Sequence, residues 1–274
     1  MQYLTIDVVG SQATASLTLY LLDNWLEIDP KRARPLVLIC PGGAYRFTSE
    51  REAEAVAVQM TAMGCHAGIL RYSCAPERYP ESLFQLARSV AMVRERAAEW
   101  HVDPDEIYVL GFSAGGHLAA TLGVFWSHED LSNALEMDKS AFRPNRLILC
   151  YPVISSGGFT HAESMENITG ARRDTPNSLW NYLSLERQVN LDTPPTFLWH
   201  TVEDPNVPVE NSLLFASALR KNQVPFELHV YQKGGHGLSL GTEEIQCKAT
   251  RYPNQPNIRS WVSLLRTWLE RTEY

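Results

Sequence analysis

The sequence predicts an α/β domain with a mostly parallel central sheet, an antiparallel hairpin at its N-terminal edge and helices on both faces. Three observations favour this class. Short apolar, β-rich runs alternate with helical segments from residue 36 onward. Two adjacent β-rich runs, 2–9 and 13–22, precede them and are separated by three turn-forming residues. No internal repeat or linker divides the 274 residues, so residues 1–274 are expected to form a single domain.

The first half of the chain alternates predicted strands with predicted helices. The strands are expected at 36–40, 66–72 and 107–110, and the helices at 49–64 and 80–100. Ser49 is a candidate N-cap with Glu52 as its capping-box partner, and Gly64 is a candidate helix end. Asp103-Pro104-Asp105 is expected to turn the chain into the strand at 107–110.

Two irregular stretches interrupt the second half. Strands are expected at 146–153, 196–201 and 226–231, and helices at 117–124, 209–221 and 258–271. Residues 125–145 are polar and irregular. No single period persists over 155–193 apart from a short helix near 179–185, so this stretch is the candidate small lid or cap.

Composition and charge exclude several classes of protein. The hydrophobic fraction is 45% and the charged fraction 20%, as in soluble enzymes. A net charge of -7 without a long basic run argues against partners such as nucleic acid or an anionic membrane. No apolar run approaches the roughly 20 residues of a membrane span, and the N-terminus lacks the pattern of a signal peptide. A cytoplasmic protein is therefore expected.

The five cysteines are odd in number and form no C-x-x-C pair. Two of them lie inside apolar strand-like runs, where cysteine behaves as a small hydrophobic residue. The sequence therefore predicts neither a disulfide framework nor a zinc site. No metal and no cofactor is expected.

Gly111-Phe112-Ser113-Ala114-Gly115 fits the G-x-S-x-G pattern. It lies between the predicted strand at 107–110 and the predicted helix that follows. Strand, tight turn and helix form the setting in which this pattern makes a nucleophile elbow. The flanking glycines let the strand and helix backbones approach closely. Ser113 is therefore the candidate nucleophile.

A serine hydroxyl needs a base that is itself oriented by a third group. In an elbow of this kind the order along the chain is Ser, then Asp or Glu, then His. His236, in a glycine-rich loop after a predicted strand, is the candidate base. Asp204 follows the predicted strand at 196–201 and is favoured over its neighbour Glu203 as the acid.

Other histidines have less favourable positions. His117, four residues after the serine, is expected to pack or hydrogen-bond as a scaffold residue, because it lies too close to swing over Ser113. His161 lies in the irregular stretch, and His200 and His229 lie within predicted strands.

Acyl transfer also requires donors for the developing oxyanion. The backbone N–H of Ala114 is one candidate, and the N–H of Gly43, in the loop after the predicted strand at 36–40, is the other, with Ala44 next. Gly42, Ala44 and Tyr45 are the candidate substrate-binding residues of this loop. All these loops follow strand ends, which in a parallel sheet meet at one edge where ligands bind.

Together these motifs resemble the α/β-hydrolase superfamily, and within it the bacterial esterase/lipase branch that includes acetyl esterases and acetylxylan-esterase-like proteins. The resemblance extends from about residue 15 to 272, and its motifs are Pro41-Gly42-Gly43-Ala44-Tyr45, Gly111–His117, Asp204 with Val207-Pro208, and Gly235-His236-Gly237. It implies a Ser113–Asp204–His236 triad and an oxyanion hole formed by Gly43 and Ala114.

One departure concerns the oxyanion loop. Hormone-sensitive-lipase-like esterases begin this loop with His-Gly-Gly-Gly, whereas Pro41 and Ala44 replace the His and the third Gly here. This difference favours the acetyl-esterase side of the resemblance.

The resemblance implies a serine carboxylesterase that acts on a small-molecule ester through an acyl-enzyme. An oxyanion loop close to the serine and a short cap favour a small acyl group, acetyl above all. Acetylated sugars or xylo-oligosaccharides are candidate substrates, since aromatic rings near the mouth could stack on a sugar. Core or lid packing is the favoured alternative for these rings, which are Tyr45, Phe47, Trp180 and Tyr182.

Two other functions remain open at this stage. An amide hydrolase, such as a formamidase or small peptidase, would use the same triad. A non-catalytic ligand receptor on the same fold is the less favoured alternative. A homo-oligomer is compatible with the sequence, which does not specify the number of subunits.

Overall fold

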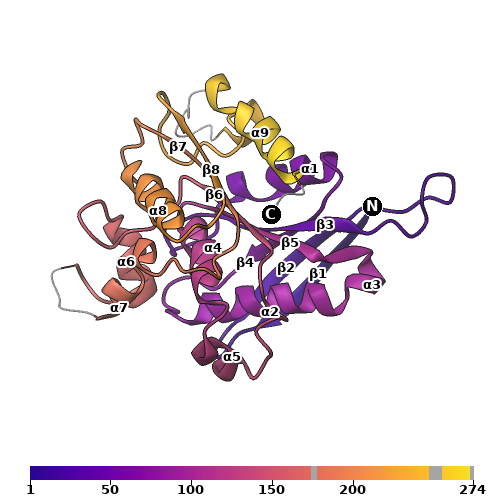
Figure 1. The fold of residues 1–274 in the computed structure, drawn as a ribbon, viewed down its shortest axis with the longest axis horizontal. Coiled ribbons are helices and arrows are strands. Elements are labelled where there is room, and N and C mark those ends of the chain that lie inside the picture. Colours follow the sequence, from indigo (N-terminus) through magenta and orange to yellow (C-terminus); the bar gives the residue numbers. More distant parts are fainter. Residues whose placement is uncertain (174–177, 247–254, 272–274) are drawn as a thin grey trace.

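The strands of the protein pair into one sheet in the order β1-β2-β4-β3-β5-β6-β7-β8 (Figure 1). The structure is a computed structural model that describes residues 1–173, 178–246 and 255–271. The strands are β1 Gln2–Val9, β2 Thr14–Leu21, β3 Arg34–Cys40, β4 His66–Arg71, β5 Val102–Phe112, β6 Arg146–Cys150, β7 Thr196–Thr201 and β8 Phe226–Tyr231. Pairing is antiparallel from β1 to β2 and from β2 to β4, and parallel between the other neighbouring strands described. The predicted mostly parallel sheet with an N-terminal hairpin is confirmed.

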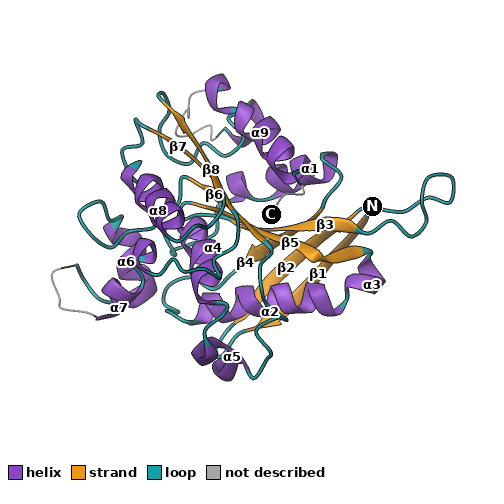
Figure 2. Ribbon diagram, viewed as in Figure 1, coloured by secondary structure: helices purple, strands orange, loops and turns teal. Residues whose placement is uncertain are grey.

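Helices cover both faces of this sheet (Figure 2). They are α1 Glu54–Ala62, α2 Glu81–Glu95, α3 Ala97–Trp100, α4 Ala114–Phe125, α5 Glu129–Leu135, α6 Ala162–Thr169, α7 Ser178–Tyr182, α8 Glu210–Lys221 and α9 Ser260–Leu269. One buried cluster joins the sheet to α2, α4 and α8, and a second joins it to α1 and α9. Because the inner strands face helices on both sides, their sequences are apolar runs rather than alternating ones.

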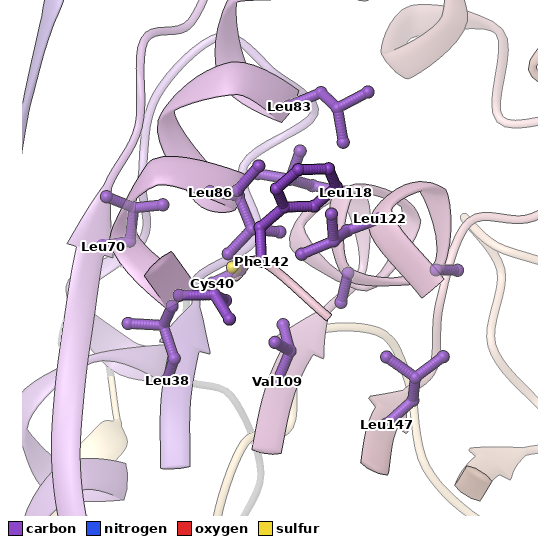
Figure 3. Packing of buried hydrophobic residues seen from close by; sticks show 14 of the residues in the cluster. Leu38, Cys40, Leu70, Leu83, Leu86, Val109, Leu118, Leu122, Phe142 and Leu147 are labelled. Carbon is purple, nitrogen blue, oxygen red and sulfur yellow. The ribbon is translucent and has the colours of Figure 1, made fainter. Parts of the chain in front are cut away.

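The core between α2, α4 and the sheet fixes the position of the elbow. Leu86 of α2 and Leu118 and Leu122 of α4 are fully or almost fully buried and lie together above Leu38 and Val109 of the central strands (Figure 3). Since α4 begins directly after Ser113, packing along its length holds the serine at the end of β5.

Two helical predictions are corrected by the structure. The helix expected over 80–100 divides into α2 and α3, because Arg96 leaves helical geometry with φ -97° and ψ 15°. The capping box expected at Ser49 and Glu52 does not form. Ser49 makes no side-chain cap hydrogen bond, and a short 3-10 helix, Glu50–Glu52, precedes α1. The Glu52 carboxylate binds more distant partners instead.

Stretches expected to be irregular contain regular elements. Asp103-Pro104-Asp105 lies inside β5, which pairs with β3 through a register shift rather than beginning after a turn. Helix α5 forms within 125–145 because Leu131 and Leu135, one turn apart, bury their side chains. Helix α6 forms within 155–193, with Met165 and Ile168 buried in the same way.

The stretch 155–193, of which 174–177 lie outside the described residues, contains α6, α7 and a 3-10 helix. Helix α6 is tied to the loop after β3 by Asn167 Nδ2, which donates to Ala44 O at 2.8 Å. The N–H of Tyr79 donates to Ile168 O at 2.8 Å. The single-domain organisation and a lid function for this stretch stay predictions.

Two further features concern the described residues as a group. None of the helices among them is long and apolar enough to cross a membrane. Cys40, Cys65, Cys74 and Cys150 are free thiols, three of them buried, and Cys247 lies outside the described residues.

Candidate active site

Ser113 occupies a strained turn between β5 and α4. Its φ of 53° and ψ of -119° lie in a region that non-glycine residues seldom adopt. The backbone of the turn is fixed because Ser113 N–H donates to Cys150 O at 3.0 Å. A Cβ on Gly111 would lie 2.2 Å from Gly115 O, so the close approach predicted for the elbow glycines is present.

The structure brings the three expected side chains together at the carboxyl edge of the sheet. Ser113 Oγ lies 2.7 Å from His236 Nε2, and His236 Nδ1 lies 2.7 Å from Asp204 Oδ2. The other oxygen of Asp204 accepts the N–H groups of Asn206 and Val207 at 3.0 and 2.9 Å. A carboxylate on Nδ1 keeps the proton there and leaves Nε2 as the acceptor that faces the serine hydroxyl.

Asp204 is held in its charged form. Burial opposes the charge, but hydrogen bonds from His200 and His236 outweigh it and keep the pKa of the Asp204 carboxyl well below its ordinary value. Its neighbour Glu203 is exposed and pairs with Lys233 at 2.5 Å. The geometry thus brings Asp204, and not Glu203, to His236.

A second histidine, which the sequence analysis left inside a strand, also contacts Asp204. His200 is fully buried, and its Nε2 lies 2.9 Å from Val207 O and 3.5 Å from Asp204 Oδ2. Its Nδ1 lies 2.8 Å from Ser212 Oγ. Because Val207 O is an acceptor, Nε2 carries the proton and also faces the carboxylate. The only sequence signal was a histidine four residues before the acid.

Glu52 links the oxyanion loop to the loop that carries His236. Its carboxylate accepts Gly42 N–H at 2.7 Å and the hydroxyl of Tyr151 at 2.6 Å, and Tyr151 Oη accepts Ser239 N–H at 2.9 Å. Burial, followed by the charge of Glu52, raises the pKa of Tyr151 well above its ordinary value. The ring of Tyr151 packs edge-on against His236 at 5.1 Å between centroids. The sequence analysis missed this network.

The expected oxyanion donors flank the serine. A Cβ on Gly42 would lie 2.9 Å from Ser113 Cβ, so this loop passes directly beside the elbow. Gly43 has a φ of 132°, which favours glycine. Within the described part of the chain, the N–H groups of Gly43, Ala44 and Ala114 make no hydrogen bond. They are therefore available to a carbonyl oxygen placed above Ser113.

A cleft of about 240 Å³ opens above these groups. Ser113, His236 and the oxyanion-loop residues Gly43 and Ala44 line it. Its walls include Phe47 from the same loop, and His161, Glu163 and Asn206 from other segments. Arg46 pairs with Glu163 at 3.1 Å and so joins the oxyanion loop to α6.

Tyr45 does not line this cleft, which corrects its expected role as a substrate contact. Its side chain is buried, and its hydroxyl lies 2.9 Å from His117 Nδ1. Trp180 is buried as well, and Tyr182 stacks on Phe125 at 4.7 Å. Packing therefore accounts for three of the four expected rings, and Phe47 borders the cleft.

His117 has the scaffold position that the sequence analysis expected. Its Nε2 lies 3.0 Å from Leu183 O, and burial lowers its pKa to about 4. The ring is therefore neutral near pH 7 and joins α4 to Tyr45 and to the segment after α7.

The structure offers no metal site among residues 1–173, 178–246 and 255–271, because no cluster of three or more His, Cys, Asp or Glu side chains suited to an ion occurs there.

Comparison with known proteins gives a consistent result. The BD-FAE family model matches residues 22–219. Endo-1,4-beta-xylanase B of Butyrivibrio fibrisolvens is 38% identical over 216 residues, which are 77% of this chain and 34% of that protein. The chain spans between one third and one half of the length of its first sequence relatives.

Solved structures match over nearly the full length. The acetyl ester-xyloside bifunctional hydrolase from Caldicellulosiruptor lactoaceticus is 34% identical, with a TM-score of 0.80 and coverage of 97% of this chain and 95% of that one. The carboxylesterase Cest-2923 from Lactobacillus plantarum WCFS1 is 29% identical, with a TM-score of 0.88 and coverage of 98% and 97%. The chain belongs to the BD-FAE family and has the α/β-hydrolase fold.

Proposed function

We propose that the chain is a serine carboxylesterase that removes short acyl groups, acetyl above all, from hydroxylated alcohols such as sugars. The observation that carries this proposal is the continuous series from Ser113 Oγ through His236 to Asp204, with 2.7 Å at each step. The similarity to an acetyl ester-xyloside hydrolase and to a xylanase supports the acetylated-sugar class.

In this mechanism the hydroxyl of Ser113 attacks the ester carbonyl while His236 Nε2 takes its proton. The oxyanion accepts hydrogen bonds from the N–H groups of Gly43 and Ala114. His236 then returns the proton to the leaving alcohol, which departs and leaves Ser113 acylated. Water, deprotonated by the same Nε2, attacks the acyl-enzyme and releases the acid. Asp204 stabilises the imidazolium that forms twice in this cycle.

The preference for a short acyl group rests on space. The cleft of about 240 Å³ must hold the acyl group together with the adjoining part of the alcohol. Arg46 and Glu163, which form an ion pair, also line this cleft. An acetyl group leaves more of this volume for the alcohol than a long acyl chain would.

The test is the Ser113→Ala variant with p-nitrophenyl acetate. We expect kcat to fall by about 10⁴-fold or more, because the nucleophile is lost. Ser263→Ala, on the exposed face of α9, is the matched control and should retain activity. Intact-mass analysis with a fluorophosphonate should show one adduct in the wild type and none in Ser113→Ala. Unchanged turnover in Ser113→Ala would contradict the proposal.

The same assay separates the alternative functions. An amide hydrolase would cleave formamides or aminoacyl amides efficiently and p-nitrophenyl acetate poorly. A ligand receptor would hydrolyse neither and would leave Ser113 unlabelled by the fluorophosphonate.

A further inference from the structure

His161 places a hydrogen-bond donor in the cleft. It is the N-cap of α6, and its Nδ1 accepts the N–H of Ser164 at 3.3 Å and lies 2.8 Å from Ser164 Oγ. A ring nitrogen that accepts a backbone N–H carries no proton, so the ring proton is on Nε2. His161 lines the cleft, and its Nε2 makes no hydrogen bond with any residue that the structure describes.

This tautomer is stable near neutral pH. Burial and the neighbouring His236 both lower the pKa of His161, outweighing the opposing charges of Glu163 and Asp204. The ring therefore stays neutral, and Nδ1 keeps its role as the acceptor of the helix cap.

The segment that carries His161 is held by a buried side chain. Asn211 is fully buried, and its Oδ1 accepts the N–H groups of Ile154 and Ser155 at 2.9 Å each. Its Nδ2 donates to Phe159 O at 2.9 Å, two residues before the histidine. A donor on so constrained a segment is pre-organised, and less entropy is lost when it binds a ligand.

His161 lines the same cleft as His236, the residue that hands the proton to the leaving alcohol. The carbonyl oxygen of a bound ester faces the N–H groups of Gly43 and Ala114, and the leaving oxygen faces His236 Nε2. His161 and His236 line the same cleft of about 240 Å³. We therefore assign the Nε2–H of His161 to the part of the substrate that leaves with the alcohol.

The neighbouring side chains suit a group that carries several hydroxyls. Glu163 presents carboxylate oxygens as acceptors, and Asn206 adds an amide that makes no side-chain hydrogen bond within the described chain. Phe47 offers an apolar ring face. Both polar side chains can exchange hydrogen bonds with water for hydrogen bonds with the hydroxyls of such an alcohol.

We propose that His161 determines specificity, donating from Nε2 to an oxygen of a polyhydroxylated alcohol such as a sugar next to the ester. The inference rests on the proposed esterase function and adds the residue that selects the alcohol.

The test compares two acetates, a mono-O-acetylated methyl xyloside with a free neighbouring hydroxyl and phenyl acetate, which has none. The measured quantity is the ratio of kcat/KM for the xyloside to kcat/KM for phenyl acetate. In His161→Leu we expect this ratio to fall about tenfold, the upper range for one lost neutral hydrogen bond. His161→Gln retains an amide N–H near the position of Nε2 and should keep most of the ratio. His128→Leu, the same change at the histidine that precedes α5, should leave the ratio unchanged.

The possible outcomes separate this inference from the function on which it rests. A role of His161 in capping α6 alone would lower both kcat/KM values together and leave the ratio within twofold of wild type, which would overturn the inference. Equal falls of the ratio in His161→Leu and His161→Gln would also overturn it. If wild-type protein hydrolysed neither ester, the proposed esterase function itself would be refuted, and the inference with it.

Discussion

Replacing Asp204 by Asn tests how the carboxylate controls the proton on His236. The carboxylate accepts hydrogen bonds of 2.7–3.0 Å from His236 Nδ1 and from the N–H groups of Asn206 and Val207. His200 Nε2 lies 3.5 Å from the oxygen that faces His236. An asparagine can keep its oxygen on the two backbone groups, which leaves its NH₂ facing His236. Nδ1 must then become an acceptor, and the proton moves to Nε2.

That proton shift removes the base from Ser113. With Nε2 protonated, the nitrogen 2.7 Å from Ser113 Oγ is a donor and does not accept the hydroxyl proton. The same exchange in the Ser-His-Asp triad of serine proteases lowers kcat by about 10⁴. At about 1.36 kcal/mol per factor of ten, this corresponds to about 5 kcal/mol of lost transition-state stabilisation. We expect a loss of this size in Asp204→Asn.

The assay is kcat for p-nitrophenyl acetate across pH, with circular dichroism to confirm folding. Glu203→Gln is the matched control, because Glu203 is the adjacent acid and pairs with Lys233 at the surface. It should stay within about twofold of wild type, since an exposed ion pair contributes little. A loss of less than tenfold in folded Asp204→Asn would refute the assignment of Asp204 as the partner of His236.

Two further predictions concern buried carboxylates. Glu52→Gln should lower kcat for p-nitrophenyl acetate by about 10- to 100-fold. The two carboxylate oxygens accept Gly42 N–H and the Tyr151 hydroxyl, and an amide has only one oxygen to replace them. A hydrogen bond to a charged group is worth about 1.5–3 kcal/mol. Activity within twofold of wild type would show that Glu52 does not hold the oxyanion loop. The second prediction follows from the lowered pKa of Asp204 in the folded protein. The stabilisation from its charged form is fully present above the unfolded pKa of about 3.9, and it is lost as the pH falls through the lower folded pKa. In urea unfolding, the stability difference between wild type and Asp204→Asn should therefore shrink below about pH 4, and a difference independent of pH would contradict this reasoning.

The sequence could place the main candidate site residues side by side because each follows a strand end in a fixed order. Ser113, Asp204 and His236 lie beyond β5, β7 and β8, and Gly43 lies beyond β3. Parallel pairing brings these strand ends to one edge, whatever the lengths of the helices between them. Short apolar runs identify such strands well, so positions immediately after them are placed reliably from sequence alone.

Glu52 shows why the remaining site residues were not predictable. Ser49 and Glu52 fit a local helix-start pattern, but Glu52 binds Tyr151, 99 residues away, and Gly42 across the loop. A buried carboxylate must be hydrogen-bonded, and in this fold its partners are distant in the chain. Local spacing cannot report such contacts, and the same holds for His161, which lines the cleft together with Ser113.

The position of α6 connects the two sides of the cleft. Ala44 and Tyr45 both have φ near 56°, a conformation that costs non-glycine residues about 1–3 kcal/mol each and that surrounding contacts must offset. One of these contacts is from α6, where Asn167 donates to Ala44 O at 2.8 Å. The N-cap of the same helix is His161, which lines the cleft. A shift of α6 would therefore change the oxyanion loop and the proposed His161 contact together, so the helix must stay in place for both to keep the geometry that the reaction needs.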